Sequence, residues 1–217
     1  MNKKRKIAIT LLTVKNIKRG KLADAVPEFD ELSTVIEHSD WHNHEPVLNH
    51  LCSVANYVKR IVRDAGAGVR KHLNQKIDRR RRRDLLYLAA LLRDIAKKET
   101  IVYRDGNTMC PGHEKLGGVK AQTILKRFDL TPKEIAFVAD IVTHHGVGHR
   151  IVTQTLQELQ NTLGVSPRVL RRIYPELILL VYADTAGSYL RRTRPEEFRS
   201  RTRFYKAALG KLHLSKA

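Results

Sequence analysis

The stretch that most constrains this 217-residue chain runs from Asp84 to Thr100, with the sequence DLLYLAALLRDIAKKET. Leucine and alanine dominate positions 85–92, so a helix here would be apolar on all sides. Such a helix belongs in the centre of a fold and not on its surface. It nevertheless ends in the charged pair Arg93-Asp94, and a buried carboxylate is costly unless a cation or a hydrogen-bond donor partners it. The sequence therefore predicts a central helix whose last turn carries a polar site.

The rest of the chain also shows helical patterns. Helices are expected over residues 27–39, 46–64, from 111 onward, 132–146, 151–163, 168–191 and 195–212. Ile101 to Met109 has β-branched residues around Asp105-Gly106, which predicts a small β-hairpin. The predicted fold is therefore all-α, a bundle of orthogonal and antiparallel helices around residues 84–95.

Residues 1–25 are expected to form a basic N-terminal extension, followed by a single helical domain over residues 26–217. A signal peptide is disfavoured, because the apolar run from Ile7 to Val14 is short and lysines follow it. No run approaches the roughly 20 apolar residues that a membrane span needs. The two cysteines have no CxxC spacing and favour free thiols in a reducing compartment. The expected location is the cytoplasm.

Six side chains on the predicted helices have the chemistry of metal ligands: His50, Asp94, His113, His144, His145 and Asp184. Asp184 resembles Asp94 in that it too follows an apolar helical run, ELILLVYA. Two carboxylates that each need a partner can meet around a cation. Imidazole and carboxylate together suit Mn, Fe, Co, Ni or Zn, and Mg where waters complete the shell. No single spacing is diagnostic, so the ordered series of ligands carries the prediction of a divalent-metal site.

That series resembles the HD-domain superfamily of metal-dependent phosphohydrolases. The family pattern is a His on one helix, a His-Asp pair ending the next, then further His residues and a late Asp. The corresponding positions here lie in NHLCSV, AALLRDIAK, PGHEKLGG, IVTHHG and VYADTAG. The resemblance covers about residues 27 to 191, and around His50 and His113 it is most similar to the HD domains of tRNA nucleotidyltransferases and their stand-alone relatives. It implies an HD-like helical bundle, without the nucleotidyltransferase activity, whose domain this sequence does not contain.

The chain departs from the family pattern at Arg93, which stands where the family has the histidine of the His-Asp pair. That histidine is a metal ligand in the family. Arginine stays protonated and cannot ligate a metal. It also places a cation beside Asp94 that competes with the metal for this carboxylate. The divalent metal that the resemblance implies is therefore either altered in its ligands or absent because of Arg93.

Three interpretations of this arginine remain open. In the first, it forms a salt bridge with Asp94 in place of a metal. In the second, one metal persists on Asp94, His113 and a member of the pair His144-His145. In the third, His50 and Asp184 hold a weak metal together with Asp94, and a water fills the vacant position.

The resemblance also implies roles in catalysis. Asp94 and Asp184 would ligate the metal, Asp184 would orient an attacking water, and Lys97 would assist as a catalytic residue. Candidate phosphate-binding side chains are Arg93, Arg150 and Arg191. The metal would lower the pKa of a water and neutralise charge on a phosphoryl oxygen.

The second feature is a run of consecutive arginines: Arg79, Arg80, Arg81, Arg82 and Arg83. Like charges in a row repel one another and favour solvent or a polyanion. The whole chain carries a net charge of +19, which also favours partners such as RNA or nucleotides. These arginines are therefore candidate nucleic-acid contacts, although no RRM, KH or zinc-finger signature accompanies them.

Two functions follow from these observations. The first is an HD-domain-like metal-dependent phosphohydrolase with a modified metal site, whose partner is a nucleotide or another phosphate ester. The second is a catalytically inactive HD-like module that binds RNA or nucleotide through its basic surface.

Overall fold

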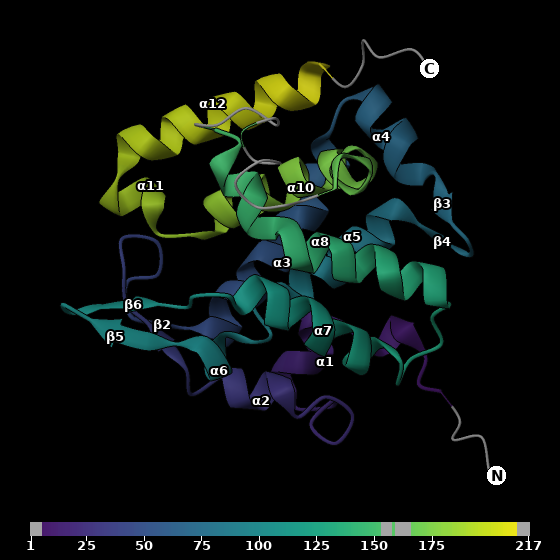
Figure 1. The fold of residues 1–217 in the computed structure, drawn as a ribbon, viewed down its shortest axis with the longest axis horizontal. Coiled ribbons are helices and arrows are strands. Elements are labelled where there is room, and N and C mark those ends of the chain that lie inside the picture. Colours follow the sequence, from purple (N-terminus) through teal and green to yellow (C-terminus); the bar gives the residue numbers. More distant parts are fainter. Residues whose placement is uncertain (1–5, 153–157, 159–165, 212–217) are drawn as a thin grey trace.

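The computed structural model describes residues 6–152, 158 and 166–211, and helices dominate it (Figure 1). The helices are η1 (Ile9–Leu11), α1 (Val14–Lys18), α2 (Glu28–Leu32), α3 (Val47–Asp64), α4 (Ala67–Asn74), α5 (Arg82–Leu92), α6 (Lys97–Thr100), α7 (His113–Leu125), α8 (Pro132–Arg150), α10 (Pro167–Gly187), α11 (Leu190–Thr193) and α12 (Pro195–Lys211). Short antiparallel pairs join β1 (Ile36–Glu37) to β2 (Glu45–Pro46), β3 (Lys76–Ile77) to β4 (Arg80–Arg81), and β5 (Val102–Arg104) to β6 (Asn107–Met109). The all-α prediction is confirmed, and so is the hairpin near residues 101–109.

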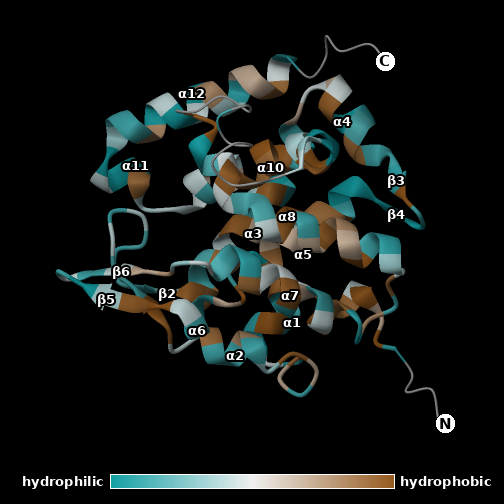
Figure 2. Ribbon diagram, in the orientation of Figure 1, coloured by the Kyte–Doolittle hydropathy of each residue, from teal (hydrophilic) through white to brown (hydrophobic). Residues whose placement is uncertain are grey.

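The helix α5 forms the centre of the bundle, as its composition predicts. Leu85, Leu86 and residues 89–92 are fully buried. Helices α3, α8 and α10 pack around it, and α12 lies along α10 (Figure 1). Figure 2 shows hydrophobic segments concentrated on the helices in the middle and hydrophilic residues on outer helices such as α12. Burial of this apolar surface is the main force that holds the bundle together.

The central helix is shorter than predicted, and the difference positions the polar site. It begins at Arg82, ends at Leu92, and is followed by a tight turn before α6. In this turn the backbone N–H of Ile95 donates to Leu92 O at 3.1 Å, and that of Lys97 donates to Asp94 O at 3.0 Å. These bonds span three residues instead of four, which winds the chain more tightly than an α-helix.

The helix predicted over residues 27–39 is also shorter, since α2 ends at Leu32. The hydroxyls of Ser33 and Thr34 donate back to the carbonyls of Asp30 and Glu31. Side chains of this type compete with the continuing helix for its carbonyl groups. The chain then turns into β1, which leads to a His-rich loop over residues 38–44.

The stretch predicted as a basic extension packs into the same hydrophobic core as the rest from Ile7 onward. Leu12, Ile17 and Leu22 are buried, and Ile7 exchanges backbone hydrogen bonds with the segment around Phe128. The predicted boundary at residue 25 therefore does not coincide with a break in the packing.

Most of the helix predicted at 151–163 lies outside the described residues. Among the residues that are described, we find no helix with the length and apolar character needed to cross a membrane.

Candidate metal centre

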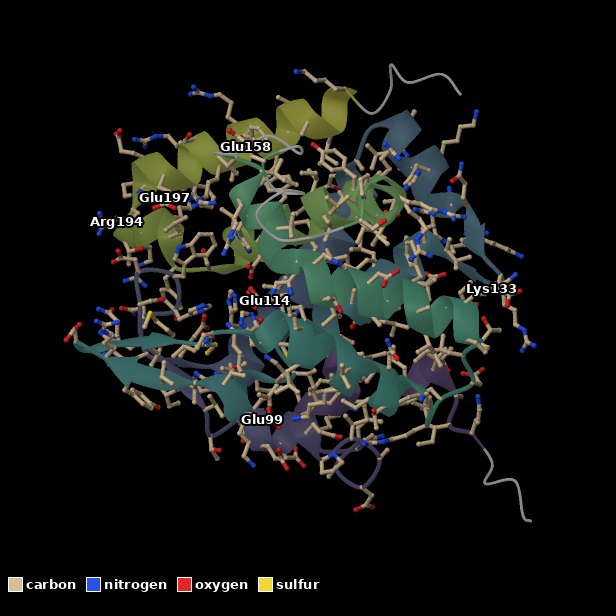
Figure 3. All side chains as sticks on the ribbon, in the orientation of Figure 1. Glu99, Glu114, Lys133, Glu158, Arg194 and Glu197 are labelled. Atoms are coloured by element: carbon tan, nitrogen blue, oxygen red, sulfur yellow. The ribbon has the colours of Figure 1, made fainter. Side chains whose placement is uncertain are left out.

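A cavity of about 320 Å³ opens where α7, α8, α10 and the turn after α5 meet. Asp94, His113, His145, His149 and Asp184 line it. Glu114, labelled in Figure 3, lies beside it in the first turn of α7. The cavity thus collects side chains from segments that are far apart in the sequence.

Arg93 is buried at 1 % exposure and lies between two carboxylates. Its Nη2 is 2.9 Å from Asp94 Oδ2 and 2.9 Å from Asp184 Oδ1. The same guanidinium donates from Nη1 to Ala90 O at 3.4 Å. Arg93 therefore supplies a fixed positive charge at the place where both buried aspartates converge.

The other oxygen of Asp94 faces a different environment. Its Oδ1 is 3.5 Å from His113 Nε2 and 3.6 Å from His145 Nε2, and these two nitrogens are 3.2 Å apart. Each imidazole donates from Nδ1 to a backbone carbonyl, His113 to Cys110 at 2.6 Å and His145 to Val142 at 2.7 Å. A neutral imidazole with its proton on Nδ1 has a lone pair on Nε2. Three electron-donating atoms therefore converge on one point.

Burial and neighbouring charges set the protonation of this cluster. Burial alone would raise the pKa of Asp94, but Arg93 and Lys97 outweigh it and hold that pKa well below its usual value. Burial lowers the pKa of His145 to about 4. Burial also acts to lower the pKa of His113, but contact with the Asp94 carboxylate outweighs it and raises that pKa. His113 therefore holds a proton more strongly than His145 does.

Asp184 connects α10 to two histidines. Its Oδ1 accepts from His50 Nε2 at 2.8 Å, and its Oδ2 accepts from His149 Nε2 at 2.9 Å. Burial would raise the pKa of Asp184, but Arg93 and both imidazoles hold it well below its usual value. The carboxylate is therefore ionised and fully engaged.

Lys97 lines the cavity, but its ammonium is paired with carboxylates. Its Nζ donates to both oxygens of Glu37 at 2.9 Å and lies 3.3 Å from Asp94 Oδ2. Burial acts to lower the pKa of Lys97, but these carboxylates outweigh it and raise it. Lys97 is a buried counter-charge for Asp94 and Glu37.

The structure brings together five of the six predicted metal ligands, and places the sixth elsewhere. His144 turns away, since its Nδ1 donates to Asp140 O at 2.7 Å within α8. Its neighbour His145 enters the cluster instead. Consecutive residues of a helix point in different directions, so only one member of the His-His pair reaches the site.

The predicted phosphate-binding arginines lie in different environments. Arg93 is buried against carboxylates, whereas Arg150 and Arg191 are exposed at the end of α8 and on α11. Neither Arg150 nor Arg191 lines the cavity.

The arginine run is not a uniform basic loop. Arg82 is buried and pairs with Glu176 at 2.7 Å, while Arg80 pairs with the buried Glu134 at 2.9 Å. Arg83 is 3.7 Å from Asp84, and Arg79 and Arg81 are exposed. Arg82 thus holds α5 to α10, and Arg80 holds β4 to α8.

Sequence reasoning missed several side chains at the site, notably His149, Glu37, His42 and Glu45. The ring of His149 lies edge-on to Trp41 with centroids 5.3 Å apart. His149 lies four residues after His145, which is the spacing that places two side chains on one face of a helix. The four-residue spacing from His145 could therefore have predicted that His149 belongs to the site.

The donor sets differ in their fit to a divalent metal. Asp94, His113 and His145 fit, because their ligand atoms lie within 4.8 Å of one another and the Nδ1 contacts leave both Nε2 atoms as acceptors. His50, Asp94 and Asp184 do not fit, because the guanidinium of Arg93 lies between the two carboxylates. No protein-family model matches this chain.

Proposed function

We propose that this protein is an HD-domain-like metal-dependent phosphohydrolase with a modified site, acting on a nucleotide or another phosphate ester. One metal would be held by Asp94, His113 and His145, which corresponds to the second interpretation of the arginine substitution. The convergence of Asp94 Oδ1 with two imidazole Nε2 atoms carries the proposal. Two imidazoles with one carboxylate favour Mn, Fe, Co, Ni or Zn over Mg.

The residues around the metal would have distinct roles in the reaction. A divalent metal, when bound, supplies positive charge that neutralises phosphoryl oxygens and favours the ionisation of water. His149 faces the cavity and is oriented by Asp184, so it is placed to accept or donate a proton. Arg93 acts as a positioning residue, since it holds both aspartates and does not face the cavity.

The test compares adjacent histidines that the structure assigns to different environments. We expect Mn²⁺- or Co²⁺-dependent hydrolysis in a screen of phosphomonoesters and phosphodiesters, abolished by His145→Ala. The His144→Ala variant, whose side chain is bonded within its own helix, should retain it. Absence of metal-dependent turnover in the unmodified protein would contradict the proposal. Turnover that survives His145→Ala but not His144→Ala would contradict the assignment of ligands.

Restoring the family histidine supplies a further check. In Arg93→His, removal of the guanidinium frees both aspartates and adds an imidazole, so metal affinity and turnover should rise. Asp94→Asn in the same background should abolish the gain. A gain that does not depend on Asp94 would show that the activity arises elsewhere.

A second function, polyanion binding, has its own observation. A groove of about 640 Å³ is lined by Lys59, Arg63, Arg70, Arg80 and Arg83, together with apolar side chains of η1, α3 and α5. Phosphate oxygens of RNA or of a nucleotide suit such a lining. This groove includes two members of the arginine run.

The alternative function predicts salt-dependent binding without catalysis. Affinity for single-stranded RNA should fall steeply with salt, and Arg83→Ala with Arg70→Ala should weaken it and flatten the salt slope. Lys133→Ala, a basic residue exposed at the start of α8, serves as the control. RNA affinity equal in the groove variants and in the control would remove this groove from consideration.

A further inference from the structure

The loop between β1 and β2, the strand β2 and the first turn of α3 together form a second cluster of histidines with a carboxylate. His50 Nδ1 lies 3.2 Å from Glu45 Oε1, and His42 Nδ1 lies 3.7 Å from the same oxygen. The ligand atoms of the three residues all lie within 4.8 Å of one another. None of them belongs to the set formed by Asp94, His113 and His145.

The three converging atoms share an unusual property. His42 Nδ1, Glu45 Oε1 and His50 Nδ1 are all buried, and none makes a well-aligned hydrogen bond among the described residues, although His50 Nδ1 and Glu45 Oε1 are 3.2 Å apart. His50 itself is fully buried. A buried polar atom without a well-aligned hydrogen bond is not compensated for its lost hydration, so three of them at one point need an explanation.

The opposite nitrogens of both imidazoles face carboxylates. His50 Nε2 donates to Asp184 Oδ1 at 2.8 Å, and His42 Nε2 is 3.5 Å from Glu37 Oε2. A carboxylate at one ring nitrogen keeps the proton there and leaves the lone pair on the other. Both imidazoles are therefore arranged as ligands through Nδ1.

We propose that His42, Glu45 and His50 form a divalent-metal site separate from that of Asp94, His113 and His145. Two imidazoles and one carboxylate suit Zn, Co, Ni, Fe or Mn. His42 also lines the cavity of about 320 Å³, which provides a route of entry for the ion. The site uses Nδ1 of His50, so it stays compatible with the Nε2 contact to Asp184.

The ion would fasten the His-rich loop to α3 and lock the ring of His50 against Asp184. The competing occupant is a proton on His50, because the carboxylates of Asp184 and Glu45 outweigh burial and raise its pKa. The inference does not depend on the proposed hydrolase activity, since it concerns different ligands and requires no substrate.

The experiment counts bound metal. Chelator-stripped protein is loaded with Zn²⁺, freed of excess by gel filtration and subjected to elemental analysis, with far-UV circular dichroism to confirm folding. We expect two equivalents in the unmodified protein, one in His42→Ala, one in the isosteric Glu45→Gln, and one in His113→Ala. His44→Asn is the matched control and should keep two, because this exposed loop imidazole stacks on His38 outside the cluster, and asparagine tolerates its φ of 58°.

The outcomes separate the two sites. If His42→Ala and Glu45→Gln bind as much zinc as the unmodified protein, the inference is wrong. A single equivalent that is lost in His113→Ala but kept in His42→Ala also overturns it and leaves the proposed function standing. A single equivalent with the reverse dependence supports the inference and overturns the metal ligands of the proposed function. No bound zinc in any variant overturns both.

Discussion

The two carboxylate oxygens of Asp94 lie in different electrostatic environments. Oδ2 lies against the guanidinium of Arg93 and the ammonium of Lys97, which are cations built into the chain. Oδ1 lies against His113 Nε2 and His145 Nε2, which offer lone pairs and at most one shared proton. One side of the carboxylate is therefore neutralised by cationic side chains of the protein, and the other side belongs to a group of residues that could hold a metal ion.

This difference explains how an arginine can be buried beside these aspartates without disrupting the fold. A buried carboxylate needs a positive partner, and a guanidinium supplies one as a metal would. Arg93 reaches both Asp94 and Asp184 with a single nitrogen, Nη2. Unlike a metal ion, this side-chain cation cannot leave the site or bind a substrate oxygen while it holds two carboxylates.

The largest expected effect is on the free energy of unfolding and comes from removing Arg93, the cation beside Asp94 Oδ2. Arg93→Ala would leave Asp94 and Asp184 buried without their shared cation, and loss of one partner of a buried pair costs about 3–5 kcal/mol. Urea denaturation measures this loss in the free energy of unfolding. Arg63→Ala is the control, because the Arg63–Asp64 pair is exposed and should leave stability unchanged. A stability equal to that of the unmodified protein would show that Arg93 does not neutralise these aspartates.

Substitutions of the histidines beside Asp94 Oδ1 should change the metal affinity and not the free energy of unfolding. His145→Ala removes a proposed ligand, so affinity for Co²⁺ or Zn²⁺ at this site should fall by at least about 100-fold, since loss of outer-shell partners alone costs about 10- to 100-fold. Isothermal titration calorimetry with chelator-stripped protein measures the change. His144→Ala should bind as the unmodified protein does. If His145→Ala and His144→Ala bind the metal with equal affinity, His145 is not a metal ligand and the proposed difference between the two sides of Asp94 is wrong.

Substitution of Lys97 tests whether the fold needs both cations beside Asp94 Oδ2, which are Arg93 and Lys97. Lys97→Met keeps the buried stem but removes the ammonium from Glu37 and Asp94, and should cost about 1–3 kcal/mol, the range for a buried polar group left unpaired. Chemical denaturation of Lys97→Met and of Glu37→Gln/Lys97→Met separates the contributions. The double variant should recover part of the loss, because the buried Glu37 charge is also gone. A double variant less stable than the single one would argue against this account.

The smallest effect concerns Glu176, a buried carboxylate neutralised by Arg82 and His72 away from the cavity. Burial acts to raise the pKa of Glu176, but these partners outweigh it and lower it from 4.5. A lowered pKa stabilises the fold above pH 4.5, and the contribution is lost as the pH falls through the lowered value. The stability advantage of the unmodified protein over Glu176→Gln should therefore narrow below pH 4.5. An advantage that is constant down to pH 2 would mean that Glu176 does not titrate in this way.

The local sequence pattern was enough to predict the helices, but it did not predict the residues at which they end. The apolar run at 85–92 predicts a buried helix because its periodicity is a property of adjacent residues. The turn after Leu92 and the early end of α2 depend on hydrogen bonds that compete with helix continuation, such as those of Ser33 and Thr34. Such competition is decided by packing, so helix ends were placed less well than helix centres.

The sequence by itself determined that this chain is helical, that Asp94 and Asp184 end apolar runs, and that histidines recur in a ligand-like order. These properties depend on side-chain type and local spacing. Only the tertiary structure decided that Arg93 joins both aspartates, that His145 and not His144 enters the cluster, and that Arg80 and Arg82 are committed to Glu134 and Glu176. Each of these contacts depends on how helices rotate against one another, because Arg93 and Asp184 are 91 positions apart in the chain and meet only when α5 and α10 are packed.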